Sequence, residues 1–359
     1  MKILSAPLKV TLAITNKCNL YCKHCGVSST RDSEELTTQE FLNLITNLVR
    51  FKVFGLNITG GEPFMRHDIF TILDFLSNLP LRFNINTNAT LINEHISKRL
   101  SRNNRLDGIL VSLDGSNPEV HDRLRGKGAF QATIKGLRAL TAYLKGKIGI
   151  FTVVTKYNFR DLENIAVLVK SFGITSVQFE PLLPQGNALY YKQELTLSHK
   201  ETIFVYDYVK KISQKFGGLI AGNYLTMGEM FRNWDSNPIQ KEDSNAKAGR
   251  LFNCQGAITK MVIRPDGWVV PCDRLWDLKL GNVREHSLPE IWLQGKPIKE
   301  FRSRFLHTVD DIEECKDCLY KSRCHGGCPA VPYYTGKGII AADPMSCYKI
   351  YKEASLSYA

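Results

Sequence analysis

The sequence has 359 residues, of which 43% are hydrophobic and 23% charged, and its formal net charge at neutral pH is +12. This composition predicts a globular protein with one large domain and a smaller one, and the lack of any apolar run of about 18 residues argues against a membrane span. Ten cysteines and no secretion signal favour metal ligation in a reducing compartment, the cytoplasm, over a disulfide framework.

The positive charge is spread along the whole chain. Because lysines and arginines do not form runs, a nucleic-acid partner is not expected. A basic surface instead suits an acidic peptide or an acidic electron carrier such as flavodoxin or ferredoxin.

From residue 8 to about 217, extended apolar runs alternate with amphipathic runs, a pattern typical of parallel β/α units. We expect helices to begin near Thr38, Asp68, Glu94, Ala129, Asp161 and His199, the first with a capping box at Thr37-x-x-Glu40. Six units rather than eight predict an α/β fold with a partial (β/α)6 barrel. The expected strands are Lys9–Ile14, Gly55–Thr59, Arg82–Thr87, Gly108–Leu113, Ile148–Thr155 and Ser176–Glu180.

Polar residues and glycines follow the predicted strands. In a β/α barrel the carboxyl ends of the strands meet at one rim, where the chemistry takes place. We therefore expect one site built from a cysteine loop after the first strand and from Gly60–Pro63, Asn86–Asn88, Ser112–Gly115 and Glu180-Pro181.

The cysteine loop reads Cys18-Asn-Leu-Tyr-Cys22-Lys-His-Cys25. Three thiolates can hold three irons of a four-iron cluster and leave the fourth iron for a molecule that carries an amine and a carboxylate. The alternative is that Cys22-x-x-Cys25 is half of a zinc ribbon or a redox dithiol.

With the aromatic His24 before its last cysteine, this loop resembles the cluster loop of radical S-adenosylmethionine (SAM) enzymes. The resemblance implies that Cys18, Cys22 and Cys25 hold a 4Fe-4S cluster that reduces SAM to methionine and a 5′-deoxyadenosyl radical. That radical takes a hydrogen atom from a substrate carbon.

Gly60-Gly61-Glu62-Pro63 resembles the family segment that grips the SAM amino group. Ser112 and Asp114 lie one alternation apart, so both are expected to point into the barrel. By resemblance these residues, with His24, Arg125 and Asn86 or Asn88, are the cofactor-binding residues. The alternatives are an ordinary turn at Gly60-Gly61 and strand-end caps at Ser112 and Asp114.

His121-Asp-Arg-Leu-Arg125-Gly126 with Gly128 and Phe130 resembles a stretch common in peptide-modifying members of the family. The planar guanidinium of Arg125 matches a carboxylate bidentately, and a surface salt bridge is the competing interpretation.

Residues 218–253 are rich in Gly, Asn and charge and are predicted to form a bridge with a short helix near Met227–Trp234. The predicted domains are therefore the barrel at 1–217, this bridge, and a cysteine-rich domain with the tail at 254–359. Within the last domain, residues 261–272 predict a β-hairpin that turns at Asp266-Gly267 and brings Cys254 near Cys272.

The last seven cysteines have the spacing of the SPASM extension of radical SAM enzymes, which carries two auxiliary iron–sulfur clusters. The resemblance implies an outer cluster on Cys315, Cys318, Cys324 and Cys347 and an inner cluster on Cys254, Cys272 and Cys328, three 4Fe-4S clusters in all. Seven thiols for two clusters leave one inner iron for solvent, for Asp273 or His325, or for substrate. A four-thiolate zinc module is the alternative.

Together these features predict a radical SAM/SPASM oxidoreductase that cross-links, oxidises or epimerises a ribosomally made peptide. Because the barrel begins by residue 8, a separate leader-binding protein, or no leader recognition, is expected. A small-molecule substrate such as a tetrapyrrole or a sugar is the second hypothesis. A non-catalytic zinc-ribbon protein that binds nucleic acid is the third.

Overall fold

The computed structural model describes residues 3–28, 34–237, 247–252 and 254–356. Across these residues ten strands form one sheet in the order β10-β9-β8-β1-β2-β3-β4-β5-β6-β7. The strands are β1 (Lys9–Ala13), β2 (Gly55–Thr59), β3 (Arg82–Thr87), β4 (Leu106–Ser112), β5 (Ile148–Val154), β6 (Val177–Pro181), β7 (Ile220–Ala221), β8 (Lys260–Ile263), β9 (Trp268–Val270) and β10 (Gly281–Asn282).

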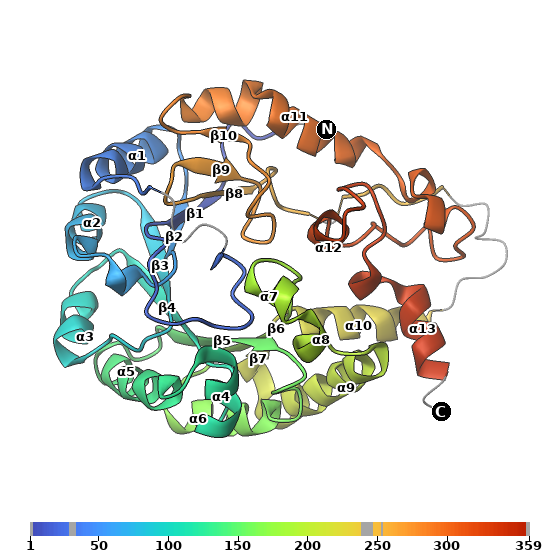
Figure 1. Ribbon diagram of the computed structural model, residues 1–359, viewed down its shortest axis with the longest axis horizontal. Helices are drawn as coiled ribbons and strands as arrows, with labels where there is room; N and C mark the ends of the chain where they lie inside the picture. Colours follow the sequence, from blue (N-terminus) through green and yellow to red (C-terminus); the bar gives the residue numbers. More distant parts are fainter. Residues whose placement is uncertain (1–2, 29–33, 238–246, 253, 357–359) are drawn as a thin grey trace.

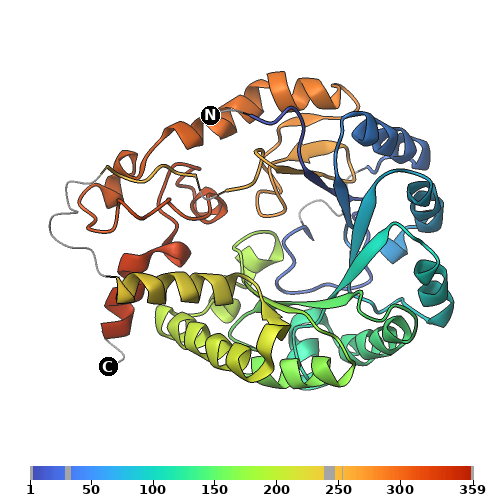
Figure 2. The ribbon, with the colours of Figure 1, turned by 180° about the vertical axis from the view of Figure 1, so that it is seen from behind.

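Strands β1 to β7 are parallel and curve into an open arc, with most of the helices on its outer side (Figures 1 and 2). This confirms the α/β partial barrel. The helices are α1 (Thr38–Arg50), α2 (Ile69–Ser77), α3 (Glu94–Ser101), α4 (Pro118–Arg125), α5 (Ala129–Tyr143), α6 (Leu162–Ser171), α7 (Asn187–Tyr190), α8 (Lys192–Leu195), α9 (His199–Phe216), α10 (Asn223–Ser236), α11 (Lys296–Ser303), α12 (Ala330–Tyr334) and α13 (Tyr348–Leu356).

Helix starts follow local capping signals. The predicted capping box of α1 is present, with the Thr37 hydroxyl accepting from Glu40 N and Glu40 accepting from Thr37 N. Helix α4 was not predicted, although Asn117 caps it and Pro118 occupies its first turn, a combination that marks helix starts. None of the described helices is long and apolar enough to cross a membrane.

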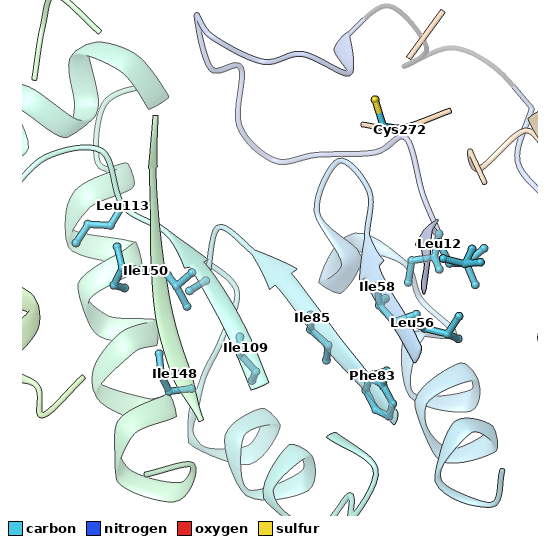
Figure 3. Close-up of a cluster of buried hydrophobic side chains, with 14 of the residues drawn as sticks. Leu12, Leu56, Ile58, Phe83, Ile85, Ile109, Leu113, Ile148, Ile150 and Cys272 are labelled. Carbon is cyan, nitrogen blue, oxygen red and sulfur yellow. The ribbon is translucent and has the colours of Figure 1, made fainter. Parts of the chain in front are cut away.

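The strands separate a helix-facing core from an inner face. Along β5, residues Ile148, Ile150, Thr152 and Val154 are buried, whereas the alternate residues Phe151 and Val153 line a cavity on the inner side. Apolar side chains from neighbouring strands form the core in Figure 3, and each fully buried Leu or Ile contributes about 1.5–3 kcal/mol. The cavity therefore has a rigid wall.

The predicted hairpin is confirmed as β8 and β9, which pair antiparallel with Gly267 at φ +84° in the turn. Its surroundings differ from the expectation of a separate cysteine-rich unit, because β8 pairs parallel with β1, Lys9 opposite Lys260. The second half of the chain thus extends the barrel sheet.

The predicted bridge also contains barrel structure. Strand β7 pairs with β6, and α10 is longer than the helix expected at Met227–Trp234 and packs against α9 and β6. Residues 238–246 and 253 of that bridge lie outside the described residues. The domain boundaries at 217 and 254 stay predictions.

Residues 304–347 contain α12 and short 3₁₀ turns in place of long elements. Figure 1 shows this segment, drawn in orange and red, in the opening of the arc between the β8–β10 side and α10. Helix α13 then packs on α9, where the rings of Tyr206 and Tyr351 lie 6.1 Å apart.

Candidate active site

A cavity of about 300 Å³ lies at the carboxyl ends of the barrel strands. Drug-sized ligands occupy pockets of about 300–1,000 Å³. The cavity brings most of the predicted site residues together: Cys18, Cys22, His24, Cys25, Gly60, Gly61, Asn86, Asn88, Ser112 and Arg125. Neither Glu62 nor Asp114 lines it, since both are completely buried behind its wall.

The cysteine loop is held by the segment that follows β6. Asn187 donates from its backbone N to Cys25 O (2.9 Å) and from its side chain to Cys22 O (3.0 Å). Gly186 has φ +55°, and a Cβ there would lie 2.4 Å from Cys25 O, so only glycine permits this approach. In Figure 1, α7 accordingly lies beside the loop.

The three thiols of this loop influence one another. Burial raises the pKa of the Cys22 thiol to about 12, and the charges of Cys25 and Cys18 act in the same direction while Arg125 opposes them. Iron binding requires thiolates, so a cluster on these residues displaces protons. Three neighbouring thiols on one cavity wall fit the three protein ligands of a four-iron cluster.

Gly60 and Gly61 are needed for packing within the chain. Gly61 N donates to Thr15 O (2.7 Å), and a Cβ on Gly61 would lie 2.3 Å from Lys17 O. The segment after β2 therefore presses against the backbone that leads into the cysteine loop. Gly60 is as close, with a Cβ 2.5 Å from Thr15 O.

Glu62 ties three parts of the rim together. Its carboxylate accepts hydrogen bonds from Thr87 Oγ1 (2.8 Å), Asn88 N (2.7 Å) and Phe64 N (3.2 Å). Burial nevertheless raises the pKa of Glu62 to about 7. The side chain of Asn88 lies 3.9 Å from Cys18 Sγ, so Glu62 holds the loop that contacts this cysteine.

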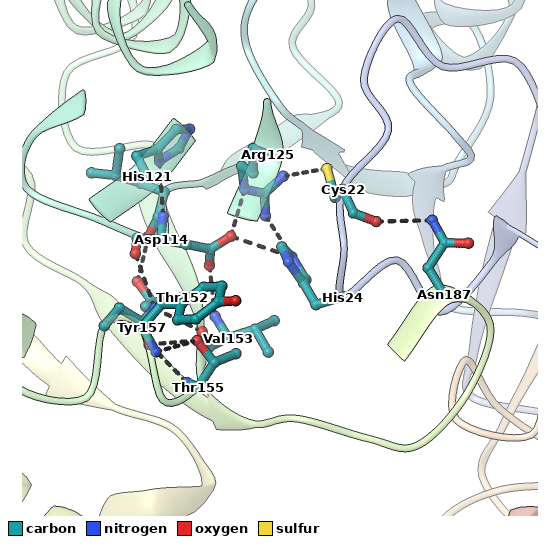
Figure 4. A network of polar contacts seen from close by, with 12 residues as sticks. Cys22, His24, Asp114, His121, Arg125, Thr152, Val153, Thr155, Tyr157 and Asn187 are labelled. Carbon is teal, nitrogen blue, oxygen red and sulfur yellow. Dashed lines mark hydrogen bonds and ion pairs between the residues drawn. The ribbon is translucent and has the colours of Figure 1, made fainter. Parts of the chain in front are cut away.

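The predicted carboxylate partner of Arg125 is a residue of the chain itself. Arg125 Nε donates to Asp114 Oδ2 (2.5 Å), and its Nη1 lies 3.9 Å from Cys22 Sγ (Figure 4). Arg125 is only 7% exposed, so the surface salt bridge is wrong. The arginine links a buried carboxylate to a cysteine of the loop.

Asp114 does not share the inner face with Ser112 as the alternation predicted. Strand β4 ends at Ser112, so the alternation does not continue to Asp114, which accepts from Val153 N (2.8 Å) and lies 3.3 Å from His24 Nε2. Although burial acts to raise it, Arg125 and His24 keep the pKa of Asp114 below its ordinary value. Burial lowers the pKa of His24 to about 4, so its imidazole is neutral at neutral pH.

The seven later cysteines separate into two groups by their mutual electrostatic interactions. Cys315 interacts with Cys318, Cys324 and Cys347. Cys272 interacts with Cys254 and Cys328 instead. These groups coincide with the predicted outer and inner sets.

All ten cysteines, each within the described residues, carry free thiols. No group of three or more His, Cys, Asp or Glu side chains arranged for a metal ion is found among those residues. In a four-iron cluster the cysteines bind different irons rather than one ion.

Sequence reasoning missed the ion pair of Glu180 with Arg274 (3.1 Å), whose two residues line the same cavity as the cysteine loop. Arg274 also opposes the rise that burial causes in the pKa of Cys328. Nearby, Gln185 donates to Asp273 O (3.0 Å) and so joins the β6 loop to the segment after Cys272. The positions of Glu180 at a strand end and of Arg274 two residues after a cysteine were the available signals.

Comparisons with known proteins agree with this geometry. Residues 12–169 match the radical SAM superfamily, and residues 254–319 match SPASM, an iron–sulfur cluster-binding domain. The mycofactocin maturase MftC of Mycobacterium ulcerans is 30% identical over 358 residues, which cover 99% of this chain and 91% of that protein. An AdoMet-dependent heme synthase of Oleidesulfovibrio alaskensis is 29% identical over 343 residues, covering 94% and 86%.

Among solved structures, Streptococcus suis SuiB bound to its precursor peptide SuiA superimposes with a TM-score of 0.74 at 20% identity, covering 96% of this chain and 76% of that one. The enzyme anSMEcpe with bound AdoMet gives 0.71 at 22% identity, with 98% of both chains covered. These likenesses confirm the fold. The sequence matches show that this chain is a member of the radical SAM superfamily with a SPASM domain, an iron–sulfur enzyme that binds SAM.

Proposed function

We propose that this enzyme modifies a ribosomally made peptide by abstracting a hydrogen atom from one of its carbons, leading to a cross-link, an oxidation or an epimerisation. The observation that carries the proposal is the cavity itself, which is lined both by Cys18, Cys22 and Cys25 and by Asp273 and Arg274 of the SPASM segment. The similarity to the mycofactocin maturase MftC, and the structural likeness to SuiB bound to its precursor peptide, support a peptide substrate.

Each cavity residue has a part in this scheme. Cys18, Cys22 and Cys25 hold the cluster that, together with SAM, supplies the 5′-deoxyadenosyl radical when reduced. The backbone at Gly60–Gly61 and the side chains of Asn86, Asn88 and Ser112 face the space for SAM. Glu62 acts on SAM through the Asn88 loop that it holds.

His24, Asp114 and Arg125 are positioning residues in this scheme. The guanidinium of Arg125 next to Cys22 favours a thiolate there, because a nearby cation stabilises the anionic form. Asp114 fixes the orientation of that guanidinium and also faces His24.

Two auxiliary 4Fe-4S clusters complete the proposed set of three. Cys315, Cys318, Cys324 and Cys347 hold the outer cluster, whereas Cys254, Cys272 and Cys328 hold the inner one and leave one iron for a further ligand. The two electrostatic groups of thiols support this division.

The proposed setting is the cytoplasm, where thiols stay reduced. The net charge of +12 suits an acidic electron donor such as flavodoxin or ferredoxin, and a separate protein presents the leader of the precursor. Nucleic acid is not a partner in this proposal.

A tetrapyrrole is the second candidate substrate, favoured by the similarity to AdoMet-dependent heme synthases. The test is anaerobic incubation of reconstituted enzyme with SAM, dithionite and candidate precursor peptides encoded beside its gene. We expect peptide that has lost two hydrogens, or peptide that has gained deuterium from heavy water, as judged by mass spectrometry. A parallel incubation contains a porphyrin with carboxylate side chains in place of the peptides. Unchanged peptides together with a modified porphyrin would replace the first proposal by the second.

A further inference from the structure

A second cavity, of about 230 Å³, lies against the first. Pro181, Leu182, Leu183 and Arg274 line both cavities, so these residues form the wall between them. The remaining walls come from the end of β5, from residues 184–197, from α9, α10, α12 and α13, and from residues 343–347. The second cavity thus lies between the barrel and the cysteine-rich segment that occupies the opening of the arc (Figure 1).

The interior of this second cavity is apolar and includes a group of aromatic rings. Rings of Tyr206, Tyr224, Phe231 and Tyr351 line it, and the ring of Tyr206 lies 5.6 Å from those of Tyr224 and Phe231. Met227 adds a thioether, which makes favourable contacts with aromatic rings.

The charged groups deep in this cavity already have partners. Arg274 is paired with Glu180, and Asp343 accepts hydrogen bonds from Cys328 N (2.9 Å) and from the Ser346 hydroxyl (2.7 Å). The exposed residues of the lining are Lys192, Thr196, His199, Thr335 and Pro344. A ligand here is therefore recognised by apolar contact rather than by charge.

The second cavity adjoins the proposed sites of both auxiliary clusters. Of the seven later cysteines, Cys328 and Cys347 line it, and they belong to different electrostatic groups. The cavity therefore lies beside the inner and the outer cysteine groups and is not enclosed by the cysteines of either group. Because Cys328 belongs to the inner group, a ligand in this cavity would lie next to that group.

We propose that this cavity binds an aromatic side chain of the substrate while the reacting residue lies in the neighbouring SAM cavity; this inference rests on the proposed function. An apolar cavity of about 150 Å³ in another protein holds benzene, so this larger one has room for an aromatic ring. Aromatic walls favour such a ring because edge-to-face and offset contacts add to the gain from burial.

The test uses small aromatic probes on the iron-loaded enzyme under anaerobic conditions. Indole and 4-ethylphenol are titrated, with 3-methylbutanol as the aliphatic comparison, and binding is followed by the rise in the unfolding temperature. We expect saturable stabilisation by both aromatic probes and at least a fivefold weaker effect of 3-methylbutanol.

Variants that fill the cavity locate the binding. Met227→Trp on α10 is expected to weaken indole binding at least tenfold, whereas the volume-conserving Met227→Leu changes it less than threefold. Ile350→Phe fills the cavity from α13 and gives the same loss if Met227→Trp does not fold, with iron content as the check on folding. Equal indole binding by the wild type and a folded filled variant, or equal binding of indole and 3-methylbutanol, would overturn the proposal.

A failure of this proposal can be distinguished from a failure of the proposed function. Formation of 5′-deoxyadenosine by the wild type, measured without any probe, reports on SAM cleavage alone. Probe binding that is lost on filling the cavity, in a protein that does not cleave SAM, would uphold the cavity as an aromatic site and reject the catalytic proposal.

Discussion

Two buried arginines show how differently the barrel and the cysteine-rich region are built. Arg125 of the barrel is paired with the carboxylate of Asp114. Arg304, which is fully buried in the second region, donates to the carbonyls of Leu251 (2.8 Å), Ile339 (2.8 Å) and Gly327 (3.3 Å) and has no ion-pair partner among the described residues.

The surroundings of Arg304 explain the difference. Although burial lowers the pKa of Arg304, the thiols of Cys254, Cys328 and Cys324 and the carboxylate of Asp343 oppose this effect. A buried cation is costly unless anions compensate it, and apart from Asp343 the anions named here are thiolates. The barrel arginine is therefore compensated by a carboxylate in direct contact, whereas Arg304 depends largely on thiolates that iron would hold deprotonated.

Removal of iron gives the largest expected contrast between the two regions. In iron-free protein, amide hydrogen exchange should rise at least tenfold in residues 304–352, because few long elements hold that region together. Strands β1 to β6 should change little, since their core is apolar. Equal loss of protection in both regions, measured by mass spectrometry, would refute this contrast.

Asp114→Asn tests the compensation within the barrel. It leaves Arg125 buried without a carboxylate, which should cost about 3–5 kcal/mol of unfolding free energy. Asp74→Asn, which breaks the exposed pair with Arg99, is the control and should cost less than about 1 kcal/mol. Similar midpoints for the two variants in denaturant would show that Arg125 does not need its partner.

Gly61→Ala tests the packing of the segment after β2 against the cysteine loop. The added Cβ meets Lys17 O at 2.3 Å, which should cost about 1–3 kcal/mol and displace the backbone that leads to Cys18. Gly218→Ala, where a Cβ meets nothing within 4 Å, should be neutral. Unchanged stability and iron content in Gly61→Ala would contradict the packing.

Glu62 should give the barrel a pH dependence of smaller size. Its pKa is about 7 in the folded protein, because of burial, and 4.5 ordinarily. The stability from this group is therefore complete below pH 4.5 and lost as the pH rises through 7, a change on the order of 3 kcal/mol. Unfolding in urea should show this decline in the wild type and a flatter one in Glu62→Gln; identical slopes would be evidence against it.

Much of the barrel was predictable because its signals are local. The alternation of extended and amphipathic runs located β2 and β3 at their observed bounds and the start of α9, and the capping box located the start of α1. The pairing of Lys9 with Lys260 had no such signal, since it joins segments far apart in sequence.

In the candidate site, too, motifs could be predicted from the sequence, whereas contacts between distant segments could not. The two cysteine groups were predicted because the spacing of these cysteines resembles that of the SPASM extension. The burial of Glu62 and Asp114 did not, because it depends on partners that the fold brings together, such as Asn88 for Glu62 and Arg125 for Asp114. A motif names the residue types at a site but does not state which of them face the ligand.

The most direct test is whether the proposed radical cluster can be removed while the two auxiliary clusters remain. Anaerobically reconstituted protein should hold about twelve irons, four for each of three clusters. Replacing Cys18, Cys22 and Cys25 together with alanine should remove about four of them and abolish 5′-deoxyadenosine formation under dithionite. A variant that still cleaves SAM, or a wild-type protein that contains stoichiometric zinc and little iron, would contradict it.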